Sequence, residues 1–289
     1  MKFGLRYCNT GPFVDPSRAV ELVQAAEEAG FESAWTIEHT VVPAGYAPVY
    51  PYSENGRMGS GADENPRPDP LIWMAYVAAA TSRIRLATGI LILPQHNPVI
   101  TAKQVATLDH MSGGRVMLGI GVGWMKEEFD ALNAVFEERG PRTDDYIQAM
   151  RALWTQDKPT YSGAFVRFEN AYCRPQPCQA TVPIIVGGHS MAAARRAGRL
   201  GDGFFPARGI PEDLIALART SAEEAGRDPA EVEITLSVPD DLARLPELAA
   251  MGVSRVLVPV ANIQGMNTVI TGPDDALAWR DRLARYAEL

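Results

Sequence analysis

Cysteine is scarce in this sequence, which has three in 289 residues. Three thiols cannot all pair with one another, so no complete disulfide framework is possible and a reduced protein is expected. Cys173 and Cys178 flank a proline-containing loop with no histidine or second cysteine pair at metal-ligand spacing. We interpret them as structural thiols and expect no metal site. Met1-Lys2 leads directly into a strand-like run rather than a secretory leader, which favours a cytoplasmic location.

Positive charge and long apolar runs are also limited. The chain has 27 Lys and Arg against 35 Asp and Glu, a formal net charge of −8 and a pI near 5.1. Because nucleic acids and anionic membranes are bound through clustered basic residues, both partner classes are disfavoured. The longest apolar run, 86–93, is far too short to cross a bilayer. The expected partner is a small molecule.

Strand-like and helix-like segments alternate along the whole chain. Asp15 before Pro16 and Asp69 before Pro70 predict helix starts, and Gly30 predicts a helix end. Eight segments have strand character: 3–7, 31–37, 84–93, 115–120, 183–186, the region around Phe204, 232–238 and 253–258.

This alternation predicts an α/β protein with a parallel sheet, and eight units predict closure into a (β/α)8 TIM barrel. With 289 residues, 46% of them hydrophobic, we expect residues 1–289 to form one domain. An open doubly wound sheet is the alternative. It is disfavoured because no Gly-x-Gly-x-x-Gly follows the first strand, where the turn reads Tyr7-Cys8-Asn9-Thr10-Gly11-Pro12.

Two segments interrupt the regular alternation. The connection at 40–68 is rich in proline, glycine and tyrosine and contains Tyr46, Tyr50 and Tyr52. A loop this long in a compact barrel is usually a lid, so we expect it to be an active-site loop that contacts substrate. Residues 160–172 are strand formers and are expected to be a small insertion.

Polar residues at strand ends need explaining, because the loops after the strands build the active site of such a barrel. Glu38-His39 follows the second strand, and the imidazole of His39 suits proton transfer. The alternative is a structural histidine. Trp124, after the fourth strand, is expected to wall the pocket or to pack. Glu127 and Glu128 are interpreted as favourable charges at a helix start.

The segment 102–124 reads as a helix ended by Ser112–Gly114 and followed by a short buried strand. Gly119, Gly121 and Gly123 stand at alternate positions, which leaves one face of the strand end without side chains. A flat ligand could lie against that backbone. The alternative is close packing of the strand against its neighbours.

The segment 183–190 reads as a strand, two glycines and a helix start. Free backbone N–H groups and the positive end of the helix form a natural anion site, and glycine lets the backbone approach a phosphate. Gly187, Gly188, His189 and Ser190 are therefore candidates for binding a cofactor phosphate. The alternative is a tight turn between strand and helix.

Several of these residues resemble the pattern of the bacterial luciferase-like flavin and deazaflavin oxidoreductases. The resemblance extends from Phe3 to about Trp279 and is strongest between Asp69 and Trp124. The matching residues are Lys103-Gln104, Leu108-Asp109, Ser112–Arg115, the glycines before Trp124, and Glu128.

The resemblance implies a site as well as a barrel. Thr88-Gly89-Ile90 stands where the family places a non-prolyl cis peptide that bulges against the central ring of the cofactor. His39 matches the family's catalytic histidine, although this chain has Glu38 where aspartate is more usual. Gly121 and Gly123, with the 187–190 segment, complete the implied cofactor site.

Within this family the chain resembles the enzymes that depend on coenzyme F420. The implied reaction is hydride transfer between the deazaflavin and a small organic substrate, in a protein expected to be a homodimer. Members that oxidise sugar phosphates or alcohols tend to carry glutamate at the position of Trp124, so those substrates are disfavoured. An FMN-dependent monooxygenase is the alternative on the same fold. A flavin-binding or deazaflavin-binding protein without turnover is the alternative from another class.

Overall fold

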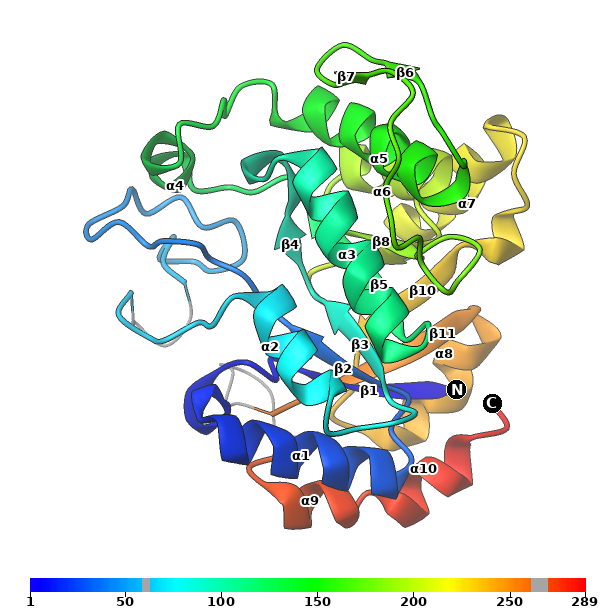
Figure 1. Ribbon diagram of the computed structural model, residues 1–289. Helices are drawn as coiled ribbons and strands as arrows, with labels where there is room; N and C mark the ends of the chain where they lie inside the picture. Colours follow the sequence, from blue (N-terminus) through cyan, green and yellow to red (C-terminus); the bar gives the residue numbers. More distant parts are fainter. Residues whose placement is uncertain (59–62, 261–269) are drawn as a thin grey trace.

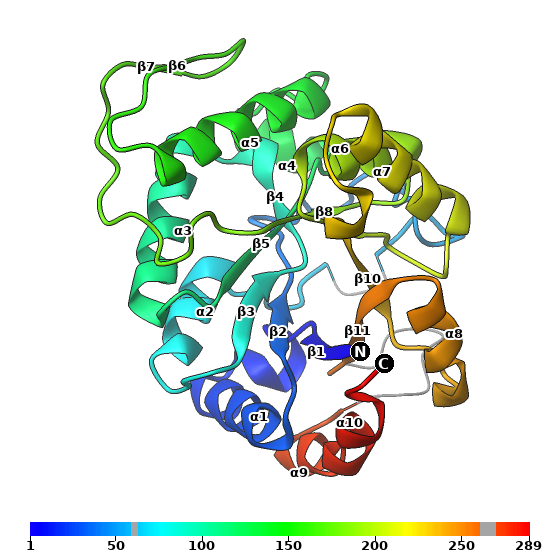
Figure 2. The same cartoon turned by 90° about the vertical axis from the view of Figure 1, so that its right-hand side faces the viewer.

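A computed structural model, which describes residues 1–58, 63–260 and 270–289, shows a closed parallel barrel surrounded by helices (Figures 1 and 2). Strands β3 and β4 both pair with β5, so nine parallel strand segments form the eight predicted strands of the barrel. Pairing of β11 with β1 closes the barrel. The segments are β1 Lys2–Arg6, β2 Ser33–Thr36, β3 Arg85–Thr88, β4 Leu91–Ile92, β5 Val116–Gly121, β8 Ile184–Gly187, β9 Gly203–Phe205, β10 Glu233–Ser237 and β11 Val253–Pro259.

The helices pack outside the barrel, and their predicted ends are confirmed. The side chain of Asp15 accepts hydrogen bonds from two backbone N–H groups of α1, and Asp69 does the same once for α2. Gly30 and Gly113 end α1 and α3 with positive φ. The helices are α1 Pro16–Ala29, α2 Pro70–Ala78, α3 Pro98–Ser112, α4 Lys126–Ala131, α5 Arg139–Thr155, α6 Met191–Leu200, α7 Glu212–Glu224, α8 Leu245–Ala250, α9 Pro273–Leu277 and α10 Arg280–Tyr286.

The predicted strand at 84–93 is interrupted at its centre. The Gly89-Ile90 peptide bond is cis, as the family resemblance implies, and it separates β3 from β4. A Cβ on Gly89 would lie 2.9 Å from the ring of Trp35. The interruption therefore lies directly above the inner core of the barrel.

The barrel interior is filled by side chains. One cluster inside the barrel consists of Trp35, Ala87, Met117, Ile185, Phe205 and Leu257. The rings of Trp35 and Phe205 meet edge to face with centroids 5.7 Å apart. The larger cluster joins the outer faces of the strands to the helices. The interior is thus a packed core beneath the carboxyl ends of the strands.

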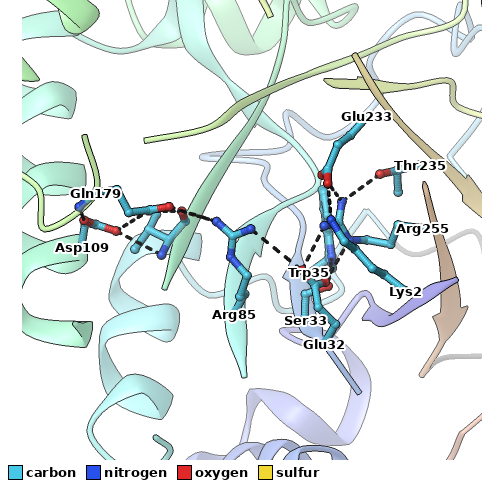
Figure 3. A network of polar contacts seen from close by, with 11 residues as sticks. Lys2, Glu32, Ser33, Trp35, Arg85, Asp109, Gln179, Glu233, Thr235 and Arg255 are labelled. Carbon is cyan, nitrogen blue, oxygen red and sulfur yellow. Dashed lines mark hydrogen bonds and ion pairs between the residues drawn. The ribbon is translucent and has the colours of Figure 1, made fainter. Parts of the chain in front are cut away.

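The amino-terminal end of the barrel is closed by a charge network (Figure 3). Arg255 is fully buried and forms ion pairs with Glu32, at 2.9 Å, and Glu233, at 3.2 Å. Burial alone would raise the pKa of Glu32, but the hydrogen bonds and charge of Arg255 outweigh it and lower that pKa. Every buried charge of this floor has a partner, so the floor is a structural element.

The residues that carry the family resemblance in α3 have an architectural role. Asp109 is fully buried and accepts hydrogen bonds from the backbone N–H groups of Val116, Cys178 and Gln179. Arg115 donates to carbonyl groups in the turn after α2. These contacts fix α3 and β5 relative to their neighbours and lie away from the site described below.

Two further segments leave the barrel. The insertion predicted at 160–172 contains an antiparallel hairpin of β6 Tyr161–Ser162 and β7 Arg167–Phe168. The loop at 40–68 lies on the same side of the barrel as α4 (Figure 1), and its residues 59–62 are outside the described part. None of the described helices is long and apolar enough to cross a membrane.

Candidate active site

His39 and Glu128 form a buried pair at the carboxyl ends of the strands. His39 follows β2 and Glu128 lies on α4, and the His39 Nδ1 atom is 2.9 Å from the Glu128 Oε2 atom. Glu128 also accepts hydrogen bonds from the backbone N–H groups of Thr40, at 2.7 Å, and Val41, at 3.3 Å. Its side chain is fully buried, whereas that of His39 is 11% exposed. Glu128, expected as a favourable charge at a helix start, lies in the first turn of α4 and in addition orients His39.

Glu38 faces away from His39. Its carboxylate accepts a hydrogen bond from the backbone N–H of Ile92, at 2.5 Å, and pairs with His96 Nε2 at 2.9 Å. Burial works against the charged imidazole, but the hydrogen bond to Glu38 outweighs it and raises the pKa of His96. Glu38 thus anchors the strand just beyond the cis peptide, and the usual aspartate is not needed to orient His39.

Trp124 is the centre of an aromatic cluster. Its ring meets His39, Tyr46 and Tyr50 edge to face, with centroid distances of 6.2, 5.4 and 5.0 Å. Tyr50 in turn contacts Tyr52 at 5.3 Å. The structure therefore brings together the four aromatic residues predicted to contact substrate and places them beside the predicted catalytic histidine.

The loop at 40–68 is held against the barrel by hydrogen bonds as well as by aromatic contacts. Glu127 accepts a hydrogen bond from the backbone N–H of Ala47 at 2.8 Å. Arg57 donates to the Tyr46 carbonyl at 2.8 Å, and the Tyr46 hydroxyl accepts from the backbone N–H of Met58 at 3.0 Å. The described part of this loop therefore has a defined position over the site.

The loop reaches the opposite side of the barrel opening through Tyr52. Burial raises the pKa of Tyr52, opposed by a hydrogen bond with the backbone of His189 and by the charge of Arg208. The hydroxyl of Tyr52 therefore lies beside the segment that follows β8. One loop covers both the histidine pair and the predicted phosphate segment.

The alternating glycines of β5 are required for close packing. A Cβ on Gly119 would overlap the Thr88 carbonyl, and one on Gly121 would lie 2.5 Å from Ile90 Cδ1. Gly123 has φ +80° and faces Ile92 and Phe129. The space that these glycines leave is filled by the Thr88 carbonyl, by the side chains of Ile90 and Ile92, and by Phe129 of α4, which supports the packing alternative.

Ile90 is the side chain that covers this glycine face. It follows the cis peptide and packs on Gly121 and Gly187, whose Cβ atom would lie 2.4 Å from Ile90 Cγ2. A flat ligand at the opening would therefore meet Ile90 rather than the bare backbone of Gly121. Thr88, Gly89 and Ile90 therefore remain the predicted cofactor-binding residues at this position.

The segment after β8 has the features of an anion site. Ser190 caps α6 through a hydrogen bond from Ala193 N, and Gly188 has φ +137°. A surface hollow of about 300 Å³ is lined by His189, Arg208, Gly209, Ile210 and Pro211. The Nδ1 atom of His189 is buried and has no partner among the described residues. Burial and the charge of Arg208 lower the pKa of His189.

The sequence did not identify Arg208 or Arg6 as residues of this region, and it singled out Glu128 without indicating the contact with His39. Arg208 follows β9, and it lies beside the phosphate segment because β9 is the neighbour of β8 in the closed barrel. Arg6 is the last residue of β1 and is buried at the barrel opening. Its signal in the sequence is a charge that directly follows the buried run Phe3-Gly4-Leu5. No group of three or more His, Cys, Asp or Glu in the described ranges is placed to hold a metal ion.

Comparison with known proteins finds relatives that match most of this chain. An uncharacterized protein of Mycobacterium tuberculosis strain H37Rv is 33% identical over 98% of both chains. The F420-dependent glucose-6-phosphate dehydrogenase of Nocardia farcinica is 30% identical over 93% of this chain and 77% of its own.

Two solved structures have the same fold over nearly their whole length. The coenzyme F420 dependent tetrahydromethanopterin reductase of Methanopyrus kandleri matches with a TM-score of 0.71, 19% identity and 99% coverage of both chains. The monooxygenase RslO1 of Streptomyces bottropensis matches with a TM-score of 0.70, 23% identity and coverage of 99% and 98%. The family model of the luciferase-like monooxygenases matches residues 5–253, and the chain belongs to this family.

Proposed function

We propose that this protein is an oxidoreductase that transfers a hydride between coenzyme F420 and a small organic substrate. The observation that carries the proposal is the 30% identity to an F420-dependent dehydrogenase over 93% of this chain. We do not propose the sugar phosphate substrate of that relative for this protein. Trp124 stands where members that oxidise sugar phosphates or alcohols tend to have glutamate, and it is packed among tyrosines.

The residues at the barrel opening fit a deazaflavin with a phosphate. Ile90, with Thr88 and Gly89 before it, would support the ring at the bulge. The orphaned Nδ1 atom of His189 and the cation of Arg208 suit a phosphate, together with the backbone of Gly187 and Gly188 and the Ser190 cap. When bound, the cofactor supplies or accepts the hydride.

His39 is the proposed proton donor or acceptor. A carboxylate only accepts hydrogen bonds, so Glu128 holds the hydrogen of the neutral imidazole on Nδ1. The Nε2 atom is then free to take a proton from the substrate, and the imidazolium can return one. Trp124, Tyr46 and Tyr50 exclude water on one side of the ring, which strengthens the electrostatic interactions of the pair.

The principal rival, an FMN-dependent monooxygenase, makes a different prediction. The test measures the bleaching of oxidised F420 with a panel of small aldehydes and, as the class that Trp124 disfavours, small alcohols, and the recovery of its colour with enones. In parallel it measures oxygen uptake with reduced FMN. We expect protein-dependent F420 turnover with part of the panel and no acceleration of oxygen uptake. Accelerated oxygen uptake without F420 turnover would favour the monooxygenase, and neither activity would favour a binding protein without turnover.

We further propose that residues 1–289 form one domain that acts as a homodimer in the cytoplasm. Ile72 and Tyr76 of α2 are 72% and 54% exposed and lie on one helix face. Ile100 and Met111 of the adjacent α3 are 59% and 80% exposed. Exposed apolar residues on two neighbouring helices suit an interface between copies. Light scattering after gel filtration tests this, and a monomer of 31.4 kDa would refute it.

A further inference from the structure

Four arginines are buried in the described part of the chain: Arg6, Arg115, Arg196 and Arg255. Arg255 forms ion pairs with two glutamates of the barrel floor (Figure 3), and Arg196 forms one with Asp144. Arg115 donates hydrogen bonds to four backbone carbonyls. Arg6 is different, because among the described residues it has neither a carboxylate partner nor a set of carbonyl acceptors like that of Arg115, and donates a single hydrogen bond. A buried charge without a counter-charge is costly and calls for a functional explanation.

The contacts of Arg6 leave much of its guanidinium without a partner. This side chain is 9% exposed and donates one hydrogen bond, from Nη1 to the Ser237 hydroxyl at 2.6 Å. Its Nε atom is buried without a partner among the described residues. The two segments outside the described part, 59–62 and 261–269, contain no Asp or Glu. The chain therefore offers no carboxylate there that could neutralise this charge.

Arg6 lies at the active end of the barrel. It is the last residue of β1, in register with Pro259 at the end of β11. Its guanidinium lies over the rings of Tyr7, at 4.4 Å, and Phe205, at 5.1 Å. Tyr50 of the 40–68 loop is close enough for the charge of Arg6 to oppose the rise of the Tyr50 pKa to about 12, which burial causes.

We propose that Arg6 is the anchor for a planar oxyanion of the substrate, so that the substrate class is small carboxylates. A guanidinium matches a carboxylate with two parallel hydrogen bonds, and Arg6 has Nε and Nη2 to offer. The aromatic rings stabilise the cation when the site is empty. This inference rests on the proposed function in taking the barrel opening as the active site. The cofactor is the alternative to the substrate as the molecule that presents this oxyanion to Arg6.

The experiment titrates the protein with acetate and benzoate, and with acetamide and benzamide as neutral analogues. Calorimetry is run with and without F420, for the parent, Arg6→Met, Arg6→Lys and Arg208→Met. We expect a carboxylate to bind the parent about tenfold or more tightly than its amide. Arg6→Met should remove this preference, and Arg6→Lys should keep part of it. Arg208→Met is the matched control and should weaken only F420 binding.

No preference in the parent, or a preference that survives Arg6→Met, overturns the proposal. Loss of F420 affinity in Arg6→Met with an intact carboxylate preference assigns the oxyanion to the cofactor and overturns the substrate class. A parent that shows the Arg6-dependent preference but does not bind F420 supports the anion site while refuting the proposed cofactor. A melting temperature for each variant identifies any that has failed to fold.

Discussion

Replacing Glu128 by glutamine tests how the site orients its histidine. The carboxylate accepts hydrogen bonds from His39 and from the backbone N–H groups of Thr40 and Val41. A glutamine amide has one oxygen, which can continue to accept from the two backbone groups. Its NH2 group then faces His39 Nδ1, which must become an acceptor. The hydrogen of the neutral imidazole is therefore expected to move from Nδ1 to Nε2.

The size of the effect follows from the contacts that are lost. A hydrogen bond to a charged group contributes about 1.5–3 kcal/mol, against about 0.5–1.5 kcal/mol for a neutral one, and Glu128→Gln replaces the bond to His39 by a neutral bond of opposite direction and weakens the other two. In domains of 150–250 residues each kcal/mol corresponds to a shift of about 2–4 °C in melting temperature, so a net loss of about 1.5–3 kcal/mol predicts a fall of roughly 3–12 °C. Turnover should fall further than stability suggests, because general acid or base catalysis contributes about 10²–10⁴-fold.

The assay is the nitrogen NMR spectrum of the imidazole rings, which distinguishes the two tautomers. The chain has four histidines, so the His39 signals can be assigned by single substitutions. Glu127→Gln is the matched control, since Glu127 is the neighbouring residue on α4 and contacts Ala47 instead of His39. An unchanged His39 tautomer in Glu128→Gln, or an equal change in both variants, would refute the reasoning.

Three further results are expected. His39→Ala should lower turnover on the order of a hundredfold or more with little change in the Kd for cofactor, because a proton donor acts in the transition state; parent-like turnover would make His39 structural. The raised pKa of His96 means that its pairing with Glu38 stabilises the fold fully below about pH 6.5 and that this contribution is lost as pH rises through the raised value. Denaturant unfolding at several pH values should show this loss in the parent and not in His96→Gln, and identical profiles would contradict it. Gly121→Ala should weaken cofactor binding and lower the melting temperature, because its Cβ displaces Ile90; fluorescence titration that finds an unchanged Kd would remove Ile90 from the site.

The barrel was predictable because its signals are local. Each strand and helix has its own periodicity, and the caps at Asp15 and Asp69 depend on residues only two or three positions away. The break inside the 84–93 strand was predictable only from the family resemblance. A strand with one glycine gives no local reason for a cis bond at Gly89-Ile90.

The orientation of the site was harder to predict because it depends on distant contacts. Glu128 is 89 residues from His39, and an acidic residue in the first turn of a helix is already explained by the helix dipole. Arg6 and Arg208 likewise acquire meaning only when the closed barrel places their strand ends around one opening. For the glycines of β5, the local sequence suggested a feature that the packing of other segments removes. Their lack of side chains suggested an open surface, but the Thr88 carbonyl and the Ile90 side chain fill it.

We propose that a deazaflavin binds at this barrel opening. The most direct test is an anaerobic titration of the purified protein with reduced F420 and with reduced FMN, comparing the two dissociation constants. We expect tighter binding of F420, and we expect Arg208→Met to weaken the binding of both cofactors, because both have a phosphate. Binding of FMN as tight as or tighter than that of F420 would contradict the assignment.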